Sequence, residues 1–361
     1  MPNADHYAIV MGISTYPQIG SINYAMRDAA RFLEWLAAAD GGDIPLGNNI
    51  QVVPATDPRS FNPADPTSLF QIKPIFEDVR RAFFQMGLRD AGFSGKRLYV
   101  YFAGHGIAPD FSDIGLLMAN AARDLENECL GVLKTRQFFD NHPIFEEVIY
   151  ILDCCRDRGL QEAAFELKPP PLNVNYNNAH LASRHAVVMA TTDRNQAFED
   201  SNLAHGEGGG VLTTALLEHL SGKGYYPGGN ITTTTLDNYL EDRVPQLAHT
   251  FGREQQAEVA TYPPNQDIIF TRIPEAQIPT VELHIYPETP IAGQIFLRNG
   301  DTMSEIDRVD ASTCARQTPW ILDLKKNTRY ALNSNANPTP EVIEPLEFSD
   351  AGPYEFVYHT Q

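Results

Sequence analysis

Two kinds of apolar pattern alternate along roughly the first 270 residues. Short runs rich in β-branched and aromatic residues predict strands, whereas apolar positions three or four residues apart predict helices. The predicted strands lie at 7–13, 50–54, 115–119 and 186–191, and in two runs that begin at Leu98 and Val148. The predicted helices lie at 23–39, 69–91, 134–141, 211–220 and 232–251. Strands that alternate with helices in this way predict a doubly wound, mostly parallel α/β sheet flanked by helices.

Two of these strands end at side chains that can do chemistry. The run from Leu98 ends at Gly104-His105-Gly106, and the run from Val148 ends at Asp153-Cys154-Cys155. Runs this apolar are typical of strands buried on both faces, as in a parallel sheet. Functional sites in such sheets lie just beyond the carboxyl ends of the strands. The sequence therefore predicts a site at this edge, where a thiol and an imidazole would meet.

The pattern changes from about residue 280. Short alternating runs separated by Gly, Asn and Pro follow one another to the end of the sequence. They predict a small antiparallel, sandwich-like β domain over 280–361, joined by the linker 273–279 to a first domain over 1–272. We expect the β domain to be an accessory interaction domain, with Cys314 structural or incidental.

Composition narrows the class of partner and the compartment. With 27 Lys and Arg against 46 Asp and Glu, the net charge is −19, which argues against a nucleic-acid or anionic-membrane surface. No run approaches the ~18 apolar residues of a membrane span. The amino terminus lacks the basic and apolar regions of a signal peptide. Four cysteines, two of them adjacent, do not suggest a disulfide framework, so we expect a cytoplasmic protein.

The thiol and the imidazole support one another as a catalytic pair. Alone, Cys155 could be an inert buried thiol, and His105 a histidine satisfied by the backbone at a strand end. Together they favour a nucleophile and its base. Alternation along the strand directs Cys154 to the other face, so we expect it in the core. The backbone N–H groups of Gly106 and Cys155 are candidate donors to a developing oxyanion.

Three segments together resemble the caspase-like cysteine peptidases, and among them the metacaspases and their bacterial relatives more than animal caspases. Residues 7–13 with 24–29 resemble the family's opening strand and the helix after it. The catalytic histidine motif is matched by Phe102-Ala103-Gly104-His105-Gly106. The Asp-X-Cys motif is matched by Asp153-Cys154-Cys155. That motif identifies Cys155 as the nucleophile. A weaker match covers 186–192 with 210–217. The resemblance implies a caspase-like fold and an endopeptidase in which Cys155 attacks and His105 transfers protons.

The resemblance also implies a primary specificity pocket. In metacaspase-like enzymes the positions that match Asp153 and Asp28 line this pocket, whereas animal caspases select an acidic residue with arginine. Two carboxylates predict a substrate Arg or Lys held by charge-assisted hydrogen bonds. From the residues alone, Asp28 could also be a solvated or capping residue on the helix over 23–39.

Regulation rests on weaker signals. The stretch 156–184 follows the nucleophile and is rich in Pro and Asn, which predicts a mobile loop that a partner or self-cleavage would switch. The loop carboxylates Asp110, Asp113 and Asp124 leave calcium activation open, because calcium prefers carboxylate oxygens. They lack an ordered ligand spacing, and acidic loops are more often solvated. We therefore predict no metal and no other cofactor.

Two other functions compete with the peptidase hypothesis. One is a caspase-like scaffold without activity that binds proteins, with the β domain as the binding module. The other is a different hydrolase or transferase that uses a Cys–His pair. The intact His105 and Cys155 argue against the first, and Asp28 against the second. We expect a protein substrate and an activating protein partner for the β domain, and the resemblance implies a bacterial defence or cell-death pathway.

Overall fold

The computed structural model describes most of the chain. The described residues are 2–57, 62, 64–88, 93–108, 113–122, 127–155, 165–170, 182–192, 196–224, 226–289, 291–335, 337–343 and 354–358. They form two compact units, the first Met1–Glu218 with Leu236–Ile268 and the second His219–Thr235 with Ile269–Gln361. None of the helices in this part of the chain is long and apolar enough to cross a membrane.

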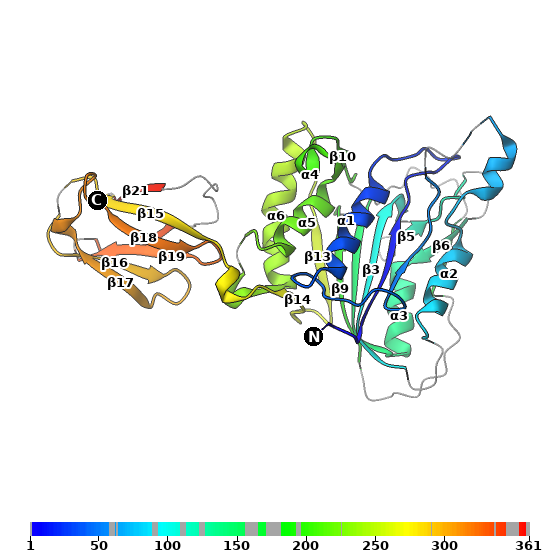
Figure 1. Ribbon diagram of the computed structural model, residues 1–361, viewed down its shortest axis with the longest axis horizontal. Helices are drawn as coiled ribbons and strands as arrows, with labels where there is room; N and C mark the ends of the chain where they lie inside the picture. The colour runs from blue at the N-terminus through cyan, green and yellow to red at the C-terminus, as the bar shows by residue number, and fades with distance from the viewer. Residues whose placement is uncertain are drawn as a thin grey trace. The chain divides into compact units, whose positions relative to one another are not determined.

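A six-stranded sheet forms the centre of the first unit (Figure 1). Its order is β13-β9-β7-β3-β1-β2. The strands are β1 (His6–Gly12), β2 (Ile50–Val52), β3 (Gly95–Gly104), β7 (Phe145–Cys154), β9 (Arg184–Met189) and β13 (Glu258–Tyr262). The first five run parallel, and β13 pairs antiparallel with β9 at the edge. This confirms the predicted mostly parallel α/β sheet.

Helices cover both faces of this sheet, which explains why its central strands are largely apolar and buried. They are α1 (Ala25–Ala37), α2 (Phe76–Gln85), α3 (Val132–Asn141), α5 (Val211–Leu220) and α6 (Thr233–His249). A further short element, α4 (Leu203–Gly206), precedes α5 in the chain. On one face, Phe32 of α1 stacks on Tyr101 of β3, with ring centroids 4.6 Å apart. On the other, Phe83 of α2 and Phe139 of α3 share an apolar cluster with the strands.

One predicted helix is wrong at its start. The pattern predicted a helix over 69–91, but the chain forms the 3-10 helix η2 (Pro66–Gln71) and then α2, which begins at Phe76. Pro74 explains the break, because a proline disfavours helical geometry in the residue before it. Asp78 then caps the new start, since its Oδ2 accepts the Ile75 N–H at 2.9 Å. The predicted end at residue 91 lies outside the described residues.

A small second sheet follows His105. It has the order β4-β5-β6-β8, with β4 (Gly106–Ile107), β5 (Gly115–Leu117), β6 (Asn127–Gly131) and β8 (Phe165–Lys168). The sequence predicted only the strand near 115. The irregular loop predicted over 156–184 is wrong at 165–168, which form β8, while 156–164 and 171–181 lie outside the described residues. Strands of this length are too short to show an alternation of apolar and polar residues in the sequence.

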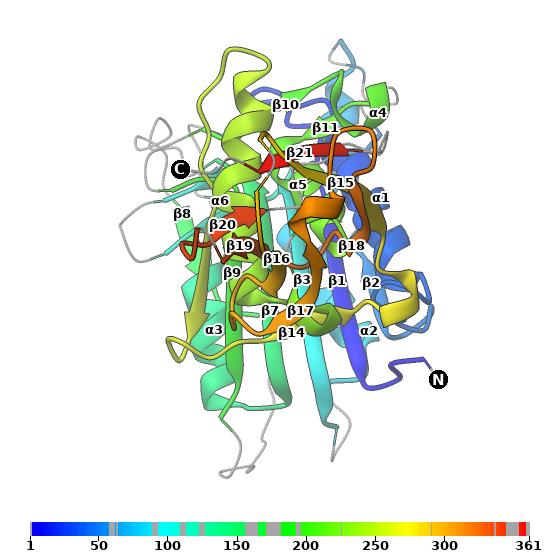
Figure 2. The ribbon, with the colours of Figure 1, turned by 90° about the vertical axis from the view of Figure 1, so that its left-hand side faces the viewer.

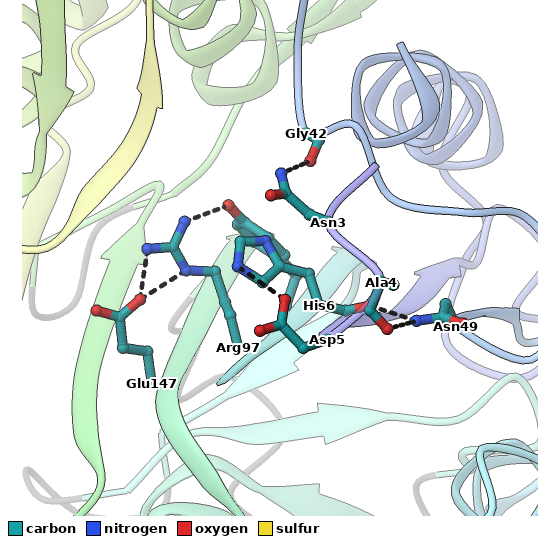
Figure 3. A network of polar contacts seen from close by, with 9 residues as sticks. Asn3, Ala4, Asp5, His6, Gly42, Asn49, Arg97 and Glu147 are labelled. Atoms are coloured by element: carbon teal, nitrogen blue, oxygen red, sulfur yellow. Dashed lines mark hydrogen bonds and ion pairs between the residues drawn. The ribbon is translucent and has the colours of Figure 1, made fainter. Parts of the chain in front are cut away.

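A buried ionic network joins three strands at their amino-terminal ends. Figure 3 shows Arg97 of β3 and Glu147 of β7 pointing toward one another, with Arg97 Nε 2.7 Å from Glu147 Oε2. Arg184 of β9 pairs with the same carboxylate. These residues are opposite one another in the strand register, Arg97 with Glu147 and Glu147 with Arg184. The network thus ties β3, β7 and β9 at the end opposite the predicted site.

The second unit is built from short strands (Figures 1 and 2). One sheet has the order β18-β15-β21 and another β17-β16-β19-β20. Their strands are β15 (Thr280–Pro287), β16 (Gln294–Asn299), β17 (Glu305–Asp310), β18 (Trp320–Lys325), β19 (Tyr330–Ser334), β20 (Glu341–Ile343) and β21 (Tyr354–Tyr358). Pairing is antiparallel except between β15 and β21. The two sheets share one apolar core. This confirms the antiparallel β part of the predicted fold, while the boundary at 272–280 stays a prediction.

The remaining elements are short. They are β10 (Glu199–Asp200), β11 (Gly209–Gly210), β12 (Asn230–Thr232), β14 (Ile269–Arg272), and the 3-10 helices η3 (Pro227–Gly229), η4 (Glu275–Gln277) and η5 (Ala311–Thr313). β10 pairs with β11, and β12 pairs with β14.

Candidate active site

The strand register brings the predicted nucleophile and base to one edge. β3 and β7 are parallel neighbours, with Ala103 opposite Asp153 and Gly104 opposite Cys154. His105 directly follows β3 and Cys155 directly follows β7, so both residues lie at the same edge of the sheet. This arrangement follows from two apolar runs of equal length.

A small pocket of about 70 Å³ lies at this edge. His105, Cys155, Asp28 and Asp153 line it, so the structure brings together these side chains from three separate motifs. Glu199 lines it too. The other lining residues are Ile22, Ala25, Ala103, Gly104, Cys154, Ala197, Phe198 and Gly210.

His105 is held by a segment that the sequence analysis missed. Its ring Nε2 lies 2.8 Å from the Gly20 carbonyl oxygen. Its backbone N–H donates to the Tyr16 hydroxyl at 3.1 Å, and the buried Tyr16 ring packs edge-on against the imidazole. A carbonyl only accepts hydrogen bonds, so Nε2 carries the proton and Nδ1 is left to exchange a proton with a thiol. No motif marks Tyr16 or Gly20.

Cys155 contacts the main chain of Ala197. The Ala197 N–H donates to Cys155 Sγ at 3.3 Å, and Sγ lies 3.7 Å from the Ala197 carbonyl oxygen. Cys155 is partly exposed, whereas Cys154 is 3% exposed and belongs to the apolar core, where strand alternation predicts it. A partly exposed sulfur that accepts an N–H bond fits a reactive thiol better than an inert one.

Gly106 packs tightly against the cysteine strand. A Cβ at this position would lie 2.6 Å from both Cys154 Sγ and the Cys155 carbonyl oxygen. A side chain is therefore excluded here, which explains the glycine after His105. The oxyanion role of the Gly106 and Cys155 N–H groups stays a prediction.

The two pocket aspartates are buried and held by short bonds. Asp153 Oδ2 accepts from the Thr213 hydroxyl at 2.6 Å and the Thr213 N–H at 3.1 Å. Asp28 Oδ2 accepts the Gly210 N–H at 2.7 Å, and Arg31 lies 3.2 Å from Oδ1. Burial is the main cause that raises the pKa of both carboxyls, and the charge of Asp153 raises the pKa of Asp28 further. The surroundings thus disfavour the charged form of both carboxyls, and a cation beside them would favour it.

Glu199 is the pocket carboxylate that the sequence analysis missed. Its Oε1 accepts the Asn23 N–H at 2.7 Å and its Oε2 accepts the Tyr24 N–H at 2.9 Å. It therefore satisfies the donors just before α1, the helix that carries Asp28. Its charge also raises the pKa of Asp153, after the larger effect of burial. Glu199 lies in a segment without a regular spacing of apolar residues and without a known motif, so the sequence does not mark it as a pocket residue.

Of the three loop carboxylates considered for calcium, the structure describes only Asp113. Asp113 is buried, and its Oδ1 accepts the N–H groups of Ile114 and Leu133 at 2.8 and 2.7 Å, which caps the start of α3. Asp110 and Asp124 lie outside the described residues. Within the described ranges, no group of three or more His, Cys, Asp or Glu side chains could hold a metal ion.

Comparison with known proteins places the chain in a family. The profile described as the caspase domain matches residues 5–261. The chain therefore belongs to the caspase-like cysteine peptidase family. A curated protein described as a probable protease, from a Desulfuromonadales bacterium, is 26% identical over 230 residues, which cover 61% of this chain. The chain spans about a quarter of that relative's length, since the match covers 26% of it.

A solved structure is more distantly similar. The crystal structure of a Geobacter sulfurreducens protein has 12% sequence identity and a TM-score of 0.39, over 71% of this chain and 92% of that one.

Proposed function

We propose that this protein is a cysteine endopeptidase that uses Cys155 and His105 as a catalytic dyad. The observation that carries the proposal is the single pocket lined by both residues together with Asp28 and Asp153. Cys155 Sγ attacks the scissile carbonyl carbon, while His105 takes the thiol proton and delivers it to the leaving amine. The Gly106 and Cys155 N–H groups stabilise the oxyanion. Water then releases the thioester, with His105 as the base.

The pocket selects arginine or lysine before the scissile bond. Asp28, Asp153 and Glu199 place carboxylates around it. The raised pKa values of both aspartates support this specificity, because a cation that enters the pocket compensates the buried charge. An acidic substrate side chain would instead meet like charge in a buried site.

The proposal also covers how the enzyme is regulated, which partners it binds and in which compartment and pathway it works. The stretch 156–184 acts as a switch, moved by a partner or cut by the enzyme. The β domain binds an activating protein partner, and the substrate is a protein. The enzyme works in the cytoplasm without nucleic acid or membrane, without a metal cofactor, and in a bacterial defence or cell-death pathway.

A fluorogenic peptide panel that varies only the residue before the cut tests this function. The wild type should cleave Arg and Lys peptides and leave Asp peptides intact. Cys155→Ala should lose at least about a thousandfold in kcat/KM, because the nucleophile is gone. Cys154→Ser is the matched control and should keep most activity. A wild type that cuts none of the peptides would favour the inactive scaffold, and cutting after Asp would show the pocket assignment to be wrong.

A further inference from the structure

A buried amide side chain lies behind the wall of the pocket. Gln255 is 2% exposed and precedes β13, far along the chain from the pocket residues. Its Oε1 accepts the Phe198 N–H at 2.8 Å, and its Nε2 donates to the Ala190 carbonyl oxygen at 3.0 Å. Both partners are main-chain groups. The side chain therefore ties the pocket segment 197–199 to the end of β9.

The bond to Phe198 also fixes what Cys155 touches. The Phe198 N–H and the Ala197 carbonyl belong to one planar peptide unit, so holding the first orients the second. That carbonyl lies 3.7 Å from Cys155 Sγ, and the Ala197 N–H lies 3.3 Å from it. The Arg253 guanidinium, 5.1 Å from the centroid of the Phe198 ring, holds the same residue from its side chain.

We propose that Gln255 is a positioning residue for the nucleophile, which keeps the Ala197 main chain against the Cys155 sulfur. The proposal rests on the proposed function of Cys155. Without the amide, the Phe198 N–H and the Ala190 carbonyl lose their protein partner, and the peptide unit rotates toward other partners. The Ala197 carbonyl, which belongs to this unit, then turns away from Cys155 Sγ, and the thiol loses an acceptor that favours its protonated form.

The test compares Gln255→Met, which keeps length but not hydrogen bonding, with the exposed neighbour Gln256→Met as the matched control. Two readouts are measured: kcat and KM for an Arg peptide, and the pH dependence of iodoacetamide alkylation at Cys155, located by mass spectrometry. Gln255→Met should lower kcat about tenfold with little change in KM, because the sulfur is no longer held in place, and should move the alkylation midpoint to lower pH. Gln256→Met should match the wild type in both.

Gln255→Glu supplies a rescue within the same site. A buried carboxyl that stays protonated keeps one acceptor and one donor, so at low pH this variant should behave as the wild type does at that pH. At high pH the ionised carboxylate still accepts from the Phe198 N–H but cannot donate to the Ala190 carbonyl, so the tie to the end of β9 is lost and the defect should return. This comparison also serves if Gln255→Met does not fold.

The proposal is wrong if the Gln255 variants lose only thermal stability. That result would be an unchanged alkylation midpoint and an unchanged kcat per folded molecule. Alkylation does not need turnover, so it separates this proposal from the proposed function. A wild type without peptidase activity would overturn the proposed function. A shifted Cys155 alkylation in Gln255→Met would still support the positioning role of Gln255.

Discussion

The imidazole of His105 depends on the conformation of one glycine. The Gly20 carbonyl that lies 2.8 Å from Nε2 belongs to a residue with φ of +101°. A side chain at this position meets no neighbour within 4 Å, so any cost of substitution is backbone strain. The ring orientation is therefore set by a main-chain turn and by Tyr16 rather than by the charge of a neighbouring side chain.

Glu199 gives a residue-scale prediction about specificity. Glu199→Gln removes one negative charge from the pocket and keeps an acceptor for one of the two N–H groups before α1. Cleavage of Arg peptides should fall about ten- to a hundredfold in kcat/KM, the effect of losing one charge-assisted bond. Cleavage of a citrulline peptide, which is neutral, should change little.

The neighbouring Asp200→Asn is the control for Glu199→Gln. Asp200 Oδ1 accepts the Asn202 N–H at 2.8 Å, and Asp200 is not among the pocket-lining residues that the structure describes. It should leave both peptides unaffected. An equal loss on the Arg and citrulline peptides in Glu199→Gln would mean that Glu199 acts only by holding α1.

Asp28 gives a residue-scale prediction about pH. Burial and the charge of Asp153 raise its pKa in the folded protein. The stability that this group contributes is therefore complete below its ordinary pKa of about 4 and is lost as pH rises through the folded value. Asp28→Asn removes this loss, so its melting temperature should fall less than that of the wild type between pH 5 and pH 9. The same variant should cleave Arg peptides more slowly.

Asp40→Asn is the control for the Asp28 experiment, because Asp40 is exposed on the surface. Its melting temperature should follow the wild-type pH dependence. Parallel pH curves for Asp28→Asn and the wild type would contradict the buried-carboxyl argument.

At the scale of elements, the parts of the site that could be predicted are those carried by periodic patterns. The runs before His105 and Cys155 are apolar because helices cover both faces of their strands. The ends of these runs therefore predicted which residues lie at the edge of the sheet. Tyr16, Gly20, Glu199 and Gln255 act through hydrogen bonds between a side chain and a main-chain group distant in sequence, which no local pattern records. The helix predicted over 69–91 was wrong only at its start, because Pro74 interrupts the helical pattern before Phe76.

The ionic network at the other end of the sheet gives an element-scale prediction. Glu147 is 5% exposed in its side chain and pairs with Arg97, which is 7% exposed, so removing the carboxylate leaves a buried guanidinium without its main partner. Glu147→Gln should lower the free energy of unfolding by about 3–5 kcal/mol, measured by urea denaturation. The exposed neighbour Glu146→Gln should change it by less than about 0.5 kcal/mol. Equal midpoints for the two variants would show that the network does not tie the strands.

At the scale of the whole molecule, the charge of the chain agrees with the pocket. A net charge of −19 attracts basic segments of other proteins, and the pocket carboxylates would then bind the arginine or lysine that such segments carry. Charge and pocket thus favour the same class of substrate. We expect the rate of cleavage of Arg peptides to fall as salt concentration rises, since screening weakens this attraction.

The stretch after the nucleophile gives a last prediction, about self-processing. It contains four basic residues, but two are held in strands: Lys168 on β8 pairs with Glu128 and Glu166, and Arg184 on β9 pairs with Glu147. A peptidase needs an extended chain that can leave its neighbours, so any cut should follow Arg156 or Arg158 and spare Lys168 and Arg184. Mass spectrometry of the wild type against Cys155→Ala measures this, because a self-made cut is absent from the inactive variant. An Arg156→Gln, Arg158→Gln double variant should stay intact. An uncut, fully active wild type whose 156–184 amides are as protected from hydrogen exchange as β3 would contradict both self-cleavage and a moving switch.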